Sequence, residues 1–119
     1  MTQLSQSAFE KATEFIAANA RPLEQAQFEY NFAAGSAASV LVELAKFQND
    51  DGGFGHGLEP DVRMPFSSPI VSTIAFELLR DLGVPGDEQI VRDGIAYFER
   101  TYDRSIGGWE SVDSRSNDY

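Results

Sequence analysis

The sequence predicts an all-α protein built from helical hairpins. Apolar residues recur at steps of three and four over five segments, which is the spacing of one face of an α-helix, and no segment shows the alternation of a β-strand. Two of the expected helices are followed by a turn and then by Gly-Gly-aromatic, so a helix-turn unit occurs twice. With 119 residues and 42% hydrophobic content, the chain 1–119 is expected to form a single helical repeat domain.

The N-terminal helices are expected within residues 7–34. Ser7 and Glu10 have the spacing of a capping box, which places the start of the first helix at residue 7. Pro22 suits the first position of a second helix, because its fixed φ is helical and its missing N–H would have no partner there. The first helix has its apolar face at Phe9, Ala12, Phe15 and Ile16.

Three further helices follow from the same spacing. The third is expected from residue 36 to about Gln48, after which glycines and acids end the pattern. Ser68 caps a fourth helix that starts at Pro69, and Asp87 caps a fifth that fades by Tyr102. The fourth helix is apolar over more than half of its circumference, so we expect a neighbour to cover it: a second copy in a homodimer or further C-terminal repeats absent from this chain. Its apolar residues are Ile70, Val71, Ile74, Ala75, Leu78, Leu79 and Leu82.

The two Gly-Gly-aromatic turns define the repeat. Repeat one spans about 36–57 and contains Gly52, Gly53 and Phe54; repeat two spans about 90–111 and contains Gly107, Gly108 and Trp109. Paired glycines permit positive φ and close backbone approach, so the aromatic ring can fold back onto the preceding helix. We therefore expect Phe54 and Trp109 to be largely buried and Gln48 to hydrogen-bond to backbone.

The segment 47–55, Phe-Gln-Asn-Asp-Asp-Gly-Gly-Phe-Gly, resembles the QW-type repeat of squalene cyclases and protein prenyltransferase β subunits, and 107–110 resembles a second copy. Gln48 and Asp51 occupy the glutamine and acidic positions, whereas the second copy has Tyr102 or Asp103 in place of glutamine. The resemblance implies an α/α toroid, two rings of helices around an apolar cavity that binds isoprenoid chains. Five helices cannot close both rings, so the expected fold is an incomplete, toroid-like ring.

A polar loop between the third and fourth helices supplies the candidate site residues: Asp50, Asp51, His56, Glu59, Asp61 and Arg63. In the family that the chain resembles, this loop leads to the mouth of the inner ring. Asp61 and Glu59 are then candidate catalytic groups, with His56 and Arg63 as candidate ligand-binding groups. The alternative is structural: the acids brace the turn and the loop, and Arg63 pairs with one of them. The offsets between His56, Glu59 and Asp61 match no established metal-ligand spacing, so we predict no metal and no cofactor.

Composition excludes several classes of function. The net charge of −10 opposes binding to nucleic acid, and the absence of cysteine excludes thiolate metal centres. No apolar run approaches the ~20 residues that span a bilayer, and the N-terminus has no leader-like segment, so a cytoplasmic location is expected.

Three functions remain open from the sequence. The chain is a toroid that binds or acts on an isoprenoid-like apolar molecule, a non-catalytic helical scaffold for protein association, or a carbohydrate-active toroid for which Trp109 and Glu110 are the local hint. It lacks the Asp-x-Asp-Asp acid motif of squalene cyclases and the cysteine and second histidine of a prenyltransferase zinc site. Catalysis is therefore left undecided.

Overall fold

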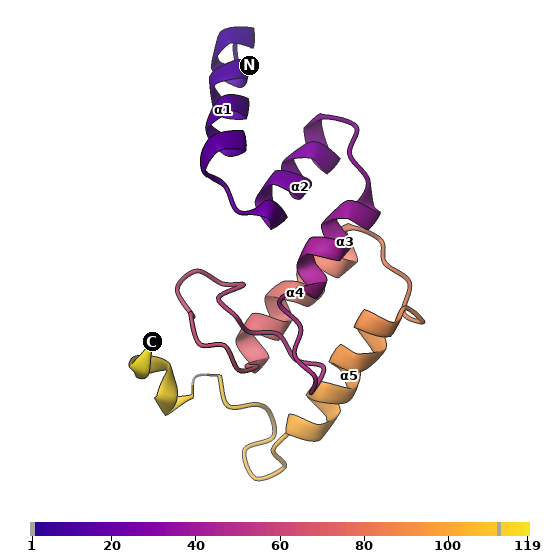
Figure 1. Ribbon diagram of the computed structural model, residues 1–119. Coiled ribbons are helices and arrows are strands. Elements are labelled where there is room, and N and C mark those ends of the chain that lie inside the picture. The colour runs from indigo at the N-terminus through magenta and orange to yellow at the C-terminus, as the bar shows by residue number, and fades with distance from the viewer. Residues whose placement is uncertain (1, 112) are drawn as a thin grey trace. The chain divides into compact units, whose positions relative to one another are not determined.

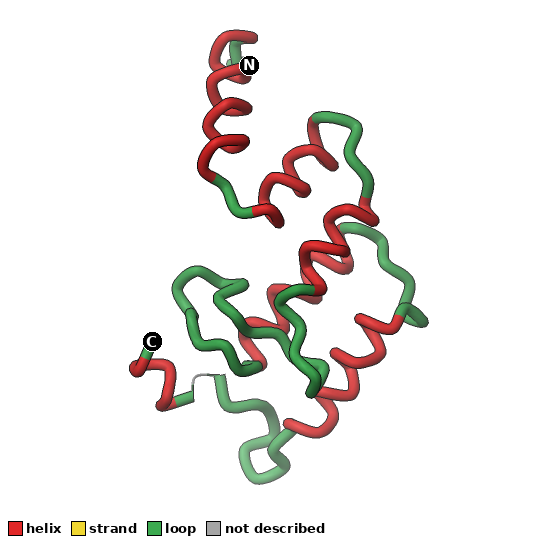
Figure 2. The backbone as a smooth tube through the Cα atoms, viewed as in Figure 1, coloured by secondary structure: helices red, strands yellow, loops and turns green. Residues whose placement is uncertain are grey.

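The computed structural model describes residues 2–111 and 113–119, and within these ranges the chain is all helical, as predicted (Figures 1 and 2). The only extended pairings described are two isolated bridges. No described helix has the length and apolar character that crossing a membrane requires. The elements are α1 (Gln6–Asn19), α2 (Pro22–Phe32), α3 (Ala37–Ala45), α4 (Pro69–Asp81), α5 (Gln89–Thr101) and a short 3-10 helix, η1 (Ser114–Asp118).

The chain divides into two compact units, Met1–Glu43 and Leu44–Tyr119. In the first unit, α1 contacts α2. Phe9 and Phe28 stack with ring centroids 6.0 Å apart, and Phe32 lies 5.2 Å from Phe28. α2 starts at Pro22 as predicted. Aromatic packing between two short helices is the main feature of this unit.

The predicted capping box of α1 is wrong. Ser5 is the N-cap, and its side-chain oxygen accepts a hydrogen bond from the Ala8 backbone N–H at 3.2 Å. The helix therefore begins earlier than expected, and Ser7 lies inside its first turn. Glu10 instead accepts a hydrogen bond from the Gln6 side-chain amide at 2.9 Å. Both serines have the chemistry of a cap, and only the backbone conformation decides between them.

The second unit contains α4 and α5, which lie side by side and are in contact (Figure 1). Phe76 and Phe98 meet edge to face at 5.5 Å, and Gly94 leaves room for the Phe76 ring, because a Cβ on Gly94 would lie 2.4 Å from it. One side of the wide α4 stripe is buried at Val71, Ala75 and Leu79. The remaining buried apolar residues of this unit are Leu44, Phe54, Leu58, Met64, Val91 and Tyr97.

The helix ends in the second unit differ in detail from the prediction. Ser68 caps α4 as expected and accepts a hydrogen bond from the Val71 N–H at 3.3 Å. The N-cap of α5 is Glu88 rather than Asp87, because the Glu88 N–H donates to Pro85 in a turn that includes Asp87. α3 ends at Ala45, before the expected Gln48, since the chain there turns to pair with Phe54.

Candidate functional site

The first Gly-Gly turn is closed by backbone hydrogen bonds and tied to α5 by one side chain. Gly52 has φ of 86°, and the Asn49 N–H donates to the Gly53 carbonyl at 2.8 Å. The Gln48 amide nitrogen donates to the carbonyls of Gly52 (2.9 Å) and Ile90 (3.0 Å). The expected hydrogen bonding of Gln48 to backbone is therefore present, and one of its two bonds reaches α5.

The same turn belongs to the core of the second unit. Phe54 is fully buried, its N–H donates to the Ser72 hydroxyl at 2.9 Å, and its carbonyl accepts from the Ser68 N–H at 3.1 Å. Asp51 accepts from the Gly53 N–H at 2.9 Å and from the Ser67 hydroxyl at 2.6 Å. These contacts give Asp51 a bracing position in the turn.

The polar loop holds its candidate residues in different settings. His56 Nε2 lies 2.6 Å from the Asn49 side-chain oxygen, a contact that pins the loop to the first turn. Glu59 accepts a long, 3.5 Å hydrogen bond from the Asp61 N–H, and within the described ranges neither acid is paired with Arg63. Asp50 and Arg63 are exposed. The described residues include no group of three or more His, Cys, Asp or Glu side chains arranged to hold a metal ion.

The second Gly-Gly turn is similar to the first, but it is one residue longer and starts from a different residue. Gly107 has φ of 66°, and the Asp103 N–H donates to the Gly108 carbonyl at 2.7 Å. Asp103 therefore occupies the hydrogen-bonding place of Asn49, which puts Tyr102 at the place of Gln48. Hydrogen bonds from the hydroxyl and N–H of Ser105 lower the pKa of the Asp103 carboxyl.

The expectation that Trp109 is largely buried is wrong. Its side chain is 41% exposed, although its indole N–H donates to the Phe98 carbonyl at 2.9 Å and its ring meets Tyr102 edge to face at 5.1 Å. Trp109 is exposed because no described helix covers the second turn as α5 covers the first. A Cβ on Gly52 would lie 2.1 Å from the Asp93 carbonyl of α5, whereas nothing lies within 4 Å of a Cβ on Gly107.

The uncovered surface is a shallow groove of about 370 Å³ whose lining is apolar apart from one carboxylate. We call it the α5 face, and it consists of Ile95, Phe98, Glu99, Tyr102 and Trp109. Ile95 and Tyr102 are each 44% exposed, and with Trp109 they bring exposed apolar surface together in one patch. The helical spacing of Ile95, Phe98 and Tyr102 is the sequence signal for this face, but spacing does not tell whether a neighbouring helix covers it.

Comparison of the chain with protein-family models, with curated proteins and with solved structures gave no match.

Proposed function

We propose that this chain is a helical-repeat association module that pairs with a second copy of itself through the α5 face. One contrast carries the proposal: the first Gly-Gly turn is covered by a helix, whereas the second, whose first glycine also has positive φ, is not. Repeat proteins bury the apolar face of each unit against a neighbour, so an uncovered unit favours association.

The covered turn indicates what kind of partner suits the open one. At the first turn the backbone of α5 approaches Gly52 so closely that no side chain fits between them, and Gln48 reaches the Ile90 carbonyl. Gly107 likewise has no side chain, and nothing lies within 4 Å of the position of its Cβ. A helix can therefore approach the second turn in the same way.

A second copy is the occupant that we favour. The α5 face is nearly all apolar, so two such faces are chemically complementary to each other in a two-fold arrangement. The net charge of −10 opposes contact between two chains over most of their surfaces, and this face carries only Glu99. Charge repulsion between two chains is therefore small at this face.

Binding of an isoprenoid-like apolar ligand is the second candidate, as the resemblance to the prenyltransferase and squalene-cyclase toroids implies. The apolar groove beside Trp109 supports it. The roles of Glu59, Asp61, His56 and Arg63 in such a toroid, and a cytoplasmic location, stay predictions from the sequence.

Light scattering coupled to size-exclusion chromatography tests the proposal. We expect a dimer for the wild-type chain and a monomer for Ile95→Glu, which places a charge in the α5 face. Val42→Glu is the matched control, because Val42 is also an exposed branched residue, 62% accessible, and the charge change is the same. It is expected to remain dimeric.

A monomeric wild type, or an Ile95→Glu variant that still dimerises, contradicts the association proposal. Farnesol, an isoprenoid alcohol, is the probe that tests the second candidate function, the binding of an isoprenoid-like ligand. Trp109 is the single tryptophan, so its emission reports directly on the α5 face. A saturable farnesol-dependent shift of that emission in a monomer favours the ligand-binding function instead.

A further inference from the structure

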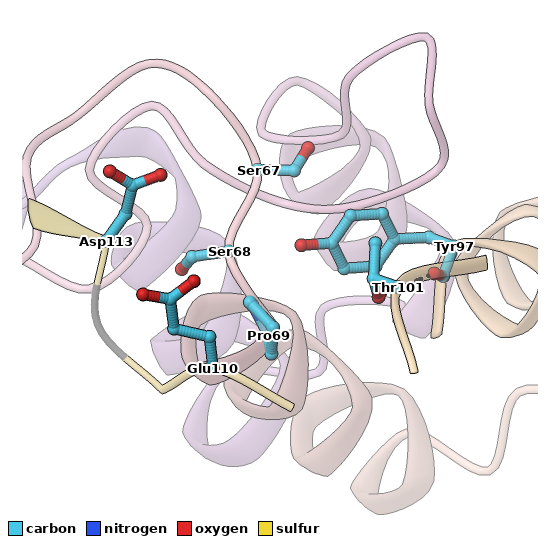
Figure 3. Close-up of a pocket in the computed structure, with 7 residues that line it drawn as sticks. All are labelled: Ser67, Ser68, Pro69, Tyr97, Thr101, Glu110 and Asp113. Carbon is cyan, nitrogen blue, oxygen red and sulfur yellow. Dashed lines mark hydrogen bonds between the residues drawn. The ribbon is translucent and has the colours of Figure 1, made fainter. Parts of the chain in front are cut away.

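A second pocket, of about 210 Å³, lies beside the start of α4 (Figure 3). It differs from the α5 face in being lined by hydroxyls and carboxylates. Its polar lining residues are Ser67, Ser68, Tyr97, Thr101, Glu110 and Asp113. This volume is below that of pockets for drug-sized ligands, so its ligand is a small one.

Tyr97 is the residue that marks this pocket as more than a surface depression. Its side chain is 4% exposed, and within the described residues no hydrogen bond is made by its hydroxyl. Figure 3 shows that hydroxyl pointing into the pocket. Burial, and then the nearby charge of Asp51, raise the pKa of Tyr97 to about 12, so the hydroxyl is neutral and both donates and accepts. Among the described residues no fully buried side-chain oxygen lacks a partner, so this unbonded hydroxyl is open to the pocket and available to a ligand.

The two carboxylates of the pocket, those of Asp113 and Glu110, differ in whether they already have a partner. Asp113 is paired with Arg115, whose Nε donates to it at 2.9 Å, and the hydrogen bonds of that side chain lower the pKa of Asp113 to about 2. The Arg115 guanidinium also lies 4.1 Å from the centre of the Phe66 ring, which holds it in place. Glu110 makes no hydrogen bond or ion pair with the described residues, and its carboxylate extends toward Ser68 in Figure 3.

In the part of the chain that the structure describes, the charged group that remains free in this pocket is an acceptor, the Glu110 carboxylate, and the hydroxyls of Ser68 and Tyr97 keep a free proton each. The Ser67 hydroxyl already donates to Asp51, and the Thr101 hydroxyl already donates to the Tyr97 carbonyl at 2.8 Å. The pocket therefore offers the Glu110 carboxylate and the Tyr97 oxygen to a ligand that brings its own N–H donors. A positive charge on that ligand would be balanced by Glu110.

We propose that this pocket binds a primary ammonium group, with Glu110 as its counter-ion and the Tyr97 hydroxyl as a second acceptor. The ammonium belongs to a small free amine or to a lysine side chain, and the chemistry of recognition is the same for both. This inference rests on residues of the second unit alone and does not depend on dimer formation.

Three small probes of similar size separate charge from shape: ethanolamine, ethylene glycol and glycolate. Binding is followed by the NMR signals of isotope-labelled tyrosine, read at Tyr97. We expect saturable shifts with ethanolamine and none with glycol or glycolate. Nα-acetyl-lysine amide is the fourth probe, and tighter binding than that of ethanolamine assigns the site to a lysine side chain.

Glu110→Gln removes the charge while keeping the shape, and Tyr97→Phe removes only the hydroxyl. We expect each to weaken ethanolamine binding about tenfold, the loss of one charged or well-placed hydrogen bond. For Tyr97→Phe the signals of the pocket's backbone amides are followed instead. Glu77→Gln, an exposed carboxylate on α4 outside the pocket, is the matched control and keeps wild-type affinity.

Absence of ethanolamine binding, equal binding of glycol or glycolate, or unchanged affinity in Glu110→Gln overturns the proposal. Glu110 is exposed, so its variant tests the site even if Tyr97→Phe does not fold.

Discussion

The Asp93 carbonyl of α5 lies directly over Gly52, so close that an ideal Cβ at Gly52 would be 2.1 Å away from it. Real Cβ atoms are not found at such distances, and the partner is backbone, which cannot rotate away as a side chain can. This approach joins the first Gly-Gly turn to α5, and it is the contact that the second turn lacks.

Gly52→Ala is therefore expected to destabilise the second unit more than Gly107→Ala. Both glycines have positive φ, 86° and 66°, and that conformation costs an alanine about 1–2 kcal/mol. Only Gly52 adds a clash, since nothing lies within 4 Å of a Cβ on Gly107. Urea unfolding followed by Trp109 emission measures both variants. Equal losses would show that the contact with Asp93 is not a tight one.

Phe54 and Trp109, the aromatic residues of the two turns, should also differ in how much their removal destabilises the protein. Phe54 is fully buried, and Phe54→Ala is expected to lower the free energy of unfolding by about 3–5 kcal/mol. Trp109 is 41% exposed and keeps one hydrogen bond and two ring contacts, so Trp109→Ala is expected to cost less. Circular dichroism melting compares the two, because the second variant has no tryptophan. A larger loss for Trp109→Ala would contradict the exposed setting of this ring.

The sequence predicts those features of the fold that depend on residues close together along the chain. Helical spacing gave all five helices, and Pro22 and Pro69 marked the first residues of α2 and α4. The prediction of Ser7 as the cap of α1 is wrong, because a serine at residue 5 suits the position equally well. Such a choice depends on backbone conformation that composition does not encode.

The candidate site was harder to predict because exposure depends on tertiary neighbours. Trp109 and Phe54 follow the same Gly-Gly pair, and only the helix that covers the first turn makes their burial differ. The apolar pattern of the fifth helix does not single out Tyr97, although its side chain is buried. A buried tyrosine in an otherwise apolar helical face is the signal that could have found the pocket.

Ser72 tests the buried hydrogen bond that holds the first turn. Its hydroxyl accepts from the Phe54 N–H at 2.9 Å, and both groups are buried. Ser72→Ala leaves that N–H without a partner and is expected to cost about 1–3 kcal/mol. Thr73→Ala is the control: its hydroxyl bonds to the Pro69 carbonyl but is exposed, so a change within about 0.5 kcal/mol is expected by urea unfolding. Similar losses in both variants would argue against a special role for the Phe54 bond.

The raised pKa of Tyr97 makes a prediction about stability in alkaline solution. Burial and the Asp51 charge disfavour the phenolate in the folded state, where the pKa is about 12, whereas the unfolded chain titrates near the ordinary value of 10. Between these values the unfolded chain loses a proton that the folded chain keeps, so the free energy of unfolding falls as the pH rises from about 10 toward 12. Below pH 10 the contribution of this group to the free energy of unfolding is fully present.

Tyr97→Phe has no such proton, and its stability should fall less steeply over that interval when urea unfolding is measured at a series of pH values. Tyr30→Phe is the matched control, because Tyr30 is 37% exposed, and it should retain the wild-type slope. Identical slopes for wild type and Tyr97→Phe would show that the folded state does not raise the pKa of the Tyr97 hydroxyl.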